Sequence, residues 1–345
     1  MNLRGNLFLY LTYTRFSSMA NGSPSAIQDK DTDTVLPSGS KFYPGDFIPL
    51  GYSAASIKLA QINGHIFQGL YSVPSQRVLS PSGNRLTRKI ILDLYGELTG
   101  WQRDVPTHLR IKSNVADNPL DPAVLRALTF LDLRFQFAVI SVTRPLLFRL
   151  VSVIRDGSFD TMSAGSRDFL TTYSKACAQS ARSSLRTLKF MRRNQLLNDC
   201  LWLDVFYILS TAMVLLLEYI RAPSSAEAYR LNECISMLRE LQPRGTARNV
   251  LDSLSDLVAF LGLDDLPVES STLDPLHNGG GGELQLYELF NITTSSSGIM
   301  EGSIQSPDIG IIGMGKSYGI RAGEGANNFA WMDQIIRIAA ELGPA

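Results

Sequence analysis

The stretch FLDLRFQFAVISVTRPLLFRLV, Phe130 to Val151, is the most informative part of the sequence for the fold class. It lies within a longer segment of helical periodicity, residues 122–155, which begins at turn-forming residues and predicts one long helix. Pro145 removes a backbone donor inside this helix, so we expect a kink there. Arg144 precedes the kink among apolar neighbours, which is costly unless a carboxylate or a freed carbonyl pairs with it. We interpret Arg144 and Pro145 as structural anchors, with contact to a ligand as the alternative.

Helical periodicity continues on both sides of this segment, over residues 52–263. Turn-forming residues divide it into further predicted helices at residues 54–73, 84–103, 165–193, 198–221, 225–241 and 246–262. One face of the 225–241 helix carries Leu231, Cys234, Ile235, Leu238 and Leu241, the spacing of an amphipathic helix packed on a core. Helices of this kind with short connections predict an all-α domain of about seven core helices.

Two segments resemble membrane or export signals without completing either pattern. The most apolar stretch, Val205 to Leu217, lies between Asp204 and Glu218 and is too short to span a bilayer, so it predicts a buried core helix. At the N-terminus, a short apolar run is diluted by polar residues and ends at Arg15. We therefore expect neither a membrane span nor export, and the sparse cysteines favour an intracellular, reducing compartment.

The composition changes after residue 263. We expect residues 1–263 to form the helical domain and residues 264–326, which are rich in glycine and serine, to be a flexible low-complexity linker. Residues 327–345 have an amphipathic pattern and are expected either to dock a coactivator or to fold back onto the helical core. The candidate coactivator contacts are Phe329, Trp331 and Ile335.

The sequence offers no catalytic or metal-binding constellation. Gly310 to Ser317, GIIGMGKS, fits the phosphate-loop pattern, but no buried strand is predicted before it and no helix after it, so we do not interpret it as a nucleotide site. Cys177, Cys200 and Cys234 are too widely spaced for a zinc site or a disulfide framework. We predict that the chain is not an enzyme and holds no cofactor of its own.

Charge is balanced overall, with 32 basic and 32 acidic residues, so the excess of positive charge that marks many nucleic-acid-binding domains is missing. One local stripe stands out because basic residues recur every three or four positions along the predicted 165–193 helix. Its members are Arg182, Arg186, Lys189 and Arg193. The stripe is a candidate contact surface for an acidic partner or a nucleic-acid backbone, and the alternative is a solvated outer face.

Several segments occur in a characteristic order. They are ANGSPSAIQDKDTDTVLP, IKLAQINGHIFQGLYS, LYGELTGWQRDVPTHLR, FLDLRFQFAVISVTRPLL, CAQSARSSLRTLKFM, WLDVFYILSTAMVLLL and LNECISMLREL. Together they resemble the fungal-specific transcription factor domain, the helical middle homology region of fungal zinc-cluster regulators. Trp101 matches the tryptophan of this family's leucine, tryptophan, proline, leucine pattern, and we interpret it as a further structural anchor. Ser23 departs from the family, which has an arginine there.

The resemblance implies an N-terminally truncated regulatory domain that modulates transcription by RNA polymerase II in the nucleus without contacting DNA itself. It implies the transcription machinery or coactivators as partners, and a small-molecule effector as a further one. Zinc is expected only in a DNA-binding module upstream of Met1. The alternative is a stand-alone helical module that binds proteins or a small ligand and does not contact DNA.

Overall fold

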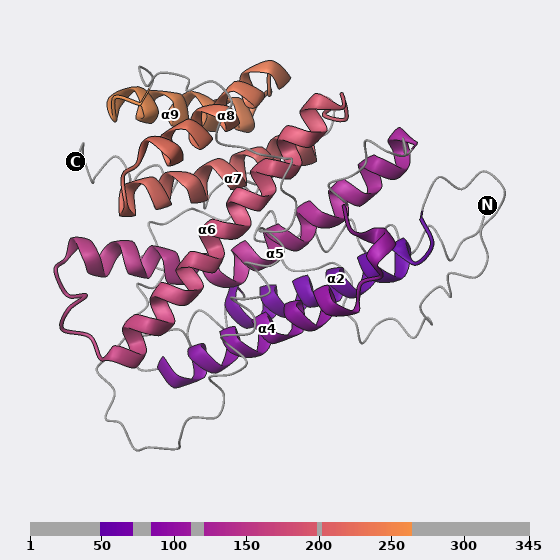
Figure 1. The fold of residues 1–345 in the computed structure, drawn as a ribbon. Coiled ribbons are helices and arrows are strands. Elements are labelled where there is room, and N and C mark those ends of the chain that lie inside the picture. Colours follow the sequence, from indigo (N-terminus) through magenta and orange to yellow (C-terminus); the bar gives the residue numbers. More distant parts are fainter. Residues whose placement is uncertain (1–48, 72–83, 112–120, 199–201, 264–345) are drawn as a thin grey trace, which may run out of the picture.

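The computed structural model of the chain describes residues 49–71, 84–111, 121–198 and 202–263. These residues form seven α-helices and no strand, which confirms the predicted all-α class. The helices are α2 (Tyr52–Ile66), α4 (Asn84–Asp104), α5 (Pro122–Arg155), α6 (Ala164–Arg193), α7 (Trp202–Arg221), α8 (Ser225–Leu241) and α9 (Thr246–Phe260). The long helices α5 and α6 cross the middle of the molecule, with α2 and α4 on one side and α7, α8 and α9 on the other (Figure 1).

Two helix starts follow directly from capping residues in the sequence. Pro122 occupies the first position of α5, where its missing N–H costs nothing, and the carboxylate of Asp121 accepts a bond from the backbone N–H of Ala123 at 2.7 Å. At α8 the hydroxyl of Ser224 accepts from the backbone N–H of Glu227 at 3.3 Å. Both predicted starts are therefore confirmed.

Helix α2 differs from the single helix expected over residues 54–73. Its α-helical part runs from Tyr52 to Ile66 and is followed by a wider, π-helical turn, η2, over Phe67–Tyr71. A π turn is rare and changes the direction in which the following side chains point. The local sequence carries no signal for it, and its consequence is the placement of Tyr71 described below.

The buried hydrophobic side chains form two clusters that share α5 and α6. One cluster lies among α5, α6, α7, α8 and α9 and includes Phe137, Phe206 and Leu238. The other lies among α2, α4, α5 and α6 and includes Leu98 and Phe135. Phe135 and Phe137 both belong to α5 but pack in different clusters, so α5 separates the two clusters.

Helix α7 is buried along the whole stretch from Val205 to Leu217, which confirms the predicted core helix. By length and composition alone, α5 and α7 are each apolar enough to cross a membrane. However, 72% and 83% of their apolar windows are buried inside the protein, which is the pattern of core helices.

The two acidic residues that flank this apolar stretch are buried as well. Asp204 accepts bonds from Nη2 of Arg126 at 3.1 Å and from the backbone N–H of Asn198 at 2.7 Å. Burial raises the pKa of Asp204 above its ordinary value, although both bonds act to lower it. Glu218, at the other end, belongs to the ion-pair network of the next section.

Candidate functional site

Pro145 leaves one carbonyl of α5 without its usual helical donor. The missing N–H would have bonded to the carbonyl of Ser141, four residues earlier. Instead, the hydroxyl of Tyr71, at the end of the π turn, donates to this carbonyl oxygen at 2.5 Å. Helix α5 continues through the proline, and its ribbon changes direction along its length, as expected for a helix with an internal proline (Figure 1).

Arg144 joins the same contact from the neighbouring position. Its side chain is buried, and its Nη2 donates to the hydroxyl oxygen of Tyr71 at 3.2 Å. Its guanidinium carbon also lies 5.6 Å from the centroid of the Tyr71 ring, within the range of a cation–π interaction. Burial raises the pKa of Tyr71, whereas Arg144 lowers it. A freed carbonyl was expected as a partner of Arg144. In the structure Arg144 bonds to the Tyr71 hydroxyl, and this hydroxyl bonds to the freed carbonyl of Ser141.

Replacing Tyr71 by phenylalanine tests this junction. The change removes the donor to Ser141 and the acceptor for Arg144, and we expect it to lower the free energy of unfolding by about 2–3 kcal/mol. Urea unfolding followed by circular dichroism measures the loss. Tyr219→Phe is the matched control, because this half-buried tyrosine makes no hydrogen bond among the described residues, and its effect should stay within about 0.5 kcal/mol. Equal losses in the two variants would show that the junction is not an anchor.

The two buried cysteines among the described residues, Cys177 and Cys234, are not poised for chemistry. Cys177 is buried, and burial raises the pKa of its thiol to about 12, whereas a hydrogen bond with Thr143 and the charge of Arg144 lower it. Burial also raises the pKa of Cys234. A reactive cysteine needs its thiolate at neutral pH, which neither residue provides. The residues that the structure describes also contain no group of three or more His, Cys, Asp or Glu side chains able to hold a metal ion.

Trp101 joins three helices. It is 8% exposed, its indole Nε1–H donates to the backbone carbonyl of Ala55 on α2 at 2.9 Å, and its ring stacks on Phe135 of α5 with centroids 5.2 Å apart. Helix α4, which carries Trp101, is thereby fixed against α2 and α5.

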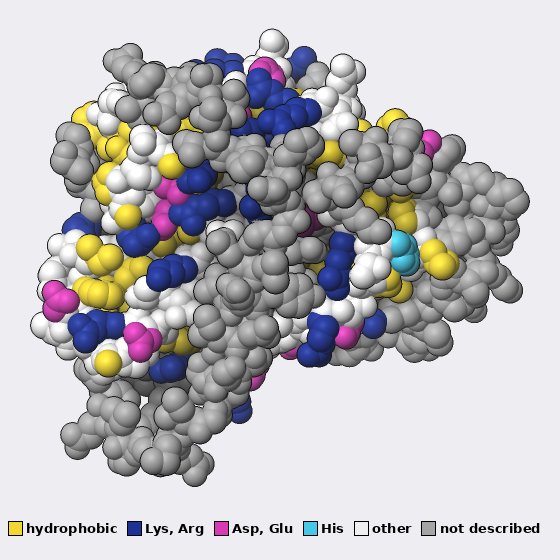
Figure 2. All heavy atoms as spheres, viewed as in Figure 1, with side chains coloured by type: hydrophobic (Ala, Val, Ile, Leu, Met, Phe, Trp, Pro, Cys, Tyr) yellow, Lys and Arg dark blue, Asp and Glu magenta, His cyan; other side chains and the backbone are white. Residues whose placement is uncertain are grey.

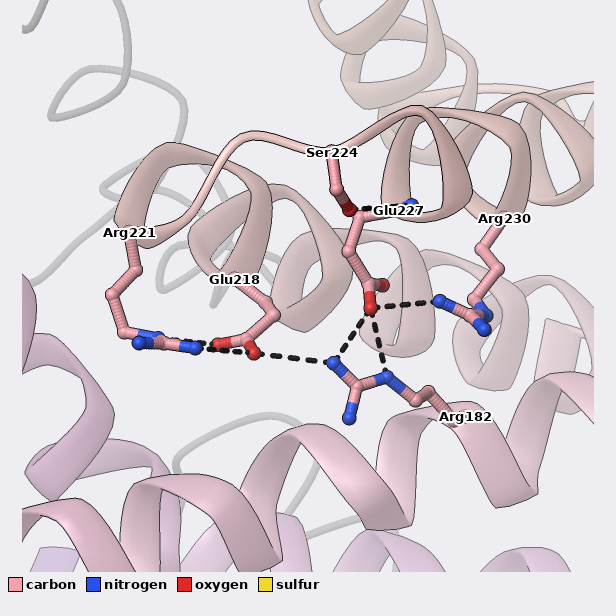
Figure 3. Close-up of polar contacts among 6 residues, drawn as sticks. All are labelled: Arg182, Glu218, Arg221, Ser224, Glu227 and Arg230. Atoms are coloured by element: carbon pink, nitrogen blue, oxygen red, sulfur yellow. Dashed lines mark hydrogen bonds and ion pairs between the residues drawn. The ribbon is translucent and has the colours of Figure 1, made fainter.

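The basic stripe on α6 divides into two kinds of residue. Arg182 lies at the centre of an ion-pair network with two buried carboxylates (Figure 3). Its Nη2 bridges Glu218 Oε1 at 3.1 Å and Glu227 Oε1 at 2.6 Å. Arg221 also forms an ion pair with Glu218, and Arg230 forms one with Glu227. The network therefore connects α6 with the end of α7 and the start of α8.

The carboxylates of this network were not identified from the sequence. Ser224 and Glu227 have the spacing of a capping box, in which the glutamate would reach back to the serine N–H. In the structure only half of the box is present, because the carboxylate of Glu227 turns to Arg182 and Arg230 instead. The local pattern thus marks the start of α8 correctly but gives the wrong partner for its acidic residue.

The other three members of the stripe differ in exposure. Lys189 pairs with Glu233 of α8 at 3.4 Å and lies 5.5 Å from the ring centroid of Tyr229, so it too belongs to the α6–α8 contact. Arg186 and Arg193 are exposed. A contact surface formed by the stripe would therefore present Arg186 and Arg193, while Arg182 and Lys189 hold the helices together.

The remaining candidates from the sequence lie outside the described residues. These are the amphipathic segment with Phe329, Trp331 and Ile335, the glycine- and serine-rich residues 264–326, and the phosphate-loop pattern at residues 310–317. Their assignments, and the domain boundaries, stay predictions.

Comparison with known proteins gives a distant relationship to fungal regulators. The chain is 23% identical over 235 residues to an uncharacterized transcriptional regulatory protein of Schizosaccharomyces pombe, a match that covers 66% of this chain and 27% of that protein. It is 32% identical over 112 residues to a second uncharacterized transcriptional regulatory protein of the same organism, covering 30% of this chain and 14% of the relative. The match thus spans about a quarter of the length of the first relative and less of the second.

No protein-family profile matches the chain, and no solved structure matches it. The narrower assignment to the fungal-specific transcription factor domain therefore stays a prediction. The names of the two relatives describe transcriptional regulators rather than enzymes, which is consistent with the predicted non-enzymatic role.

Proposed function

We propose that the helical unit is the regulatory domain of a fungal transcription regulator, acting in the nucleus on transcription by RNA polymerase II without contacting DNA itself. The observation that carries this proposal is the similarity over two thirds of the chain to a transcriptional regulatory protein. The balanced charge of the chain and its many internal ion pairs support a role separate from DNA binding. Coactivators or the transcription machinery are the proposed partners, and a small-molecule effector is a further one.

A tethering experiment in fission yeast tests the proposal. The full chain is fused to an unrelated DNA-binding module, and a reporter gene carries the binding sites of that module. We expect reporter expression to differ severalfold from that with the DNA-binding module alone, because a regulatory domain acts wherever it is brought to a promoter. The unfused chain should not shift duplex DNA in a gel-retardation assay.

The control is the same fusion carrying Trp101→Ala, which removes a packing anchor and should lose the effect on the reporter. Unchanged reporter expression with a folded, equally abundant wild-type fusion would contradict the proposal. That result would leave the stand-alone binding module, the alternative drawn from the sequence, as the better description.

A further inference from the structure

Helices α6 and α8 end side by side and present positive charge that no carboxylate among the described residues pairs with. Arg192 in the last turn of α6 forms an ion pair with Glu240 in the last turn of α8, which fixes the two ends together. The last part of α6 from Arg186 onward, the last turn of α8 and the loop before α9 carry four exposed arginines, for which the described residues supply no carboxylate within ion-pair distance. We call this group the cationic end, and it consists of Arg186, Arg193, Arg239 and Arg244. Figure 2 shows Lys and Arg side chains gathered beside α8 on the face drawn.

Helix ends explain part of this charge. Basic side chains in the last turn of a helix are favoured by the helix dipole, which accounts for Arg193 and Arg239. Arg186 lies two turns before the end of α6, and Arg244 lies between α8 and α9, so neither belongs to a last turn. Elsewhere on α6, Arg182 and Lys189 are paired with carboxylates, whereas Lys175 is exposed at a distance from this end of the helix. The cationic end is therefore a local excess of positive charge, which an acidic partner would neutralise.

The chain contains a negatively charged segment, complementary to the cationic end, immediately after the described helices. Residues 264–290 contain neither lysine nor arginine and place acidic residues among leucines and aromatic residues. The acidic residues are Asp264, Asp265, Glu269, Asp274, Glu283 and Glu288. Since the whole chain is neutral, this acidic segment offsets much of the cationic excess on the helices.

The point where the chain leaves the helices lies close to the cationic end. The backbone carbonyl of Leu263 accepts a bond from the side-chain amide of Asn232 on α8 at 2.9 Å. Arg239 follows Asn232 by seven positions, which places it on the same face of α8 about 10 Å further along the helix. An extended chain covers about 3.3 Å per residue, so Asp265 to Asp274 can reach the arginines.

We propose that the acidic segment, residues 264–290, docks on the cationic end of α6 and α8 within the same molecule. Each exposed charge pair contributes at most about 1 kcal/mol. Attachment at Leu263 raises the effective concentration of the segment to about the millimolar range, so a few weak pairs suffice. An acidic protein segment suits this surface better than duplex DNA, because α8 also carries Glu240 and Glu233, which would repel a continuous line of phosphates. The proposal does not depend on the role of the chain in transcription.

The test uses the full chain with a photo-activated cross-linking amino acid in place of Leu273. After illumination, mass spectrometry should find it joined to the peptides that carry Arg186, Arg193 or Arg239. The yield should fall severalfold when the salt concentration is raised from 50 to 500 mM, since the Debye length shortens from about 14 Å to about 4 Å. Arg193→Glu combined with Arg239→Glu should abolish these cross-links, and changing Asp265 and Glu269 to lysine in that variant should restore them.

Lys175→Glu is the matched control, because Lys175 is exposed on the same helix α6, about 27 Å from Arg193, and its reversal should leave the cross-links unchanged. Circular dichroism checks that each variant keeps its helices. Three results would overturn the proposal: cross-links that ignore the charge reversal, cross-links that join two isotopically distinct copies of the chain, or duplex DNA bound by the cationic end in place of the segment.

Discussion

Replacing Trp101 by alanine should lower the free energy of unfolding by about 3–5 kcal/mol. The loss has two parts. The indole buries its ring against Phe135, and truncation leaves a cavity between α4 and α5. The change also removes the bond from the indole N–H to the carbonyl of Ala55 on α2. Urea unfolding followed by far-ultraviolet circular dichroism measures the change.

Trp101→Phe separates the two contributions. A phenylalanine keeps an aromatic ring against Phe135 and loses the N–H donor, so we expect a cost of about 1–2 kcal/mol. If Trp101→Ala cost no more than Trp101→Phe, the ring would not be the packing anchor that its position between three helices indicates.

Replacing Arg182 by alanine should cost about 3 kcal/mol, the low end of the range for breaking a buried ion pair. The change leaves the buried carboxylates of Glu218 and Glu227 close together without the arginine that bridges them. Arg221 and Arg230 still contact one carboxylate each, which is why we expect the smaller value. Thermal and urea unfolding of the full chain check the result.

The same stripe supplies the matched controls for this prediction. Arg186→Ala and Arg193→Ala remove the same side chain from the same helix at exposed positions, and each should change the free energy of unfolding by less than about 0.5 kcal/mol. Equal effects at all three positions would contradict the division of the stripe into packing and exposed residues.

The sequence predicted the helices well where local chemistry controls them. Helix α5 matches residues 122–155 because Asp121 and Pro122 define its start, and α8 matches residues 225–241 because Ser224 caps it. The π turn over Phe67–Tyr71 was not predicted, because residues 54–73 were expected to form one uniform helix; its last residue, Tyr71, bonds to the Ser141 carbonyl of α5. A helix boundary that depends on packing against residues distant in the chain is not visible in the local sequence pattern.

In the candidate site, too, the sequence does not predict contacts between residues that are distant in the chain. The need of Arg144 for a partner followed from its apolar neighbours, but Tyr71 lies 73 residues away in the chain, and nothing in the sequence connects the two. The stripe on α6 was visible from its spacing, whereas the division between Arg182 and Arg186 depends on carboxylates from α7 and α8. Residue type and periodicity predict which side chains need a partner, and the tertiary fold decides which partner they receive.

Helix α5 has a consequence for how this protein could be recombined with others. Its face with Phe135 is covered by α2 and α4, and its face with Phe137 is covered by α7. A recombination event that replaced either half of the chain would leave one face of α5 against a surface that did not evolve with it, with exposed apolar area that favours aggregation. We therefore expect the helices from α2 to α9 to tolerate recombination only as one unit.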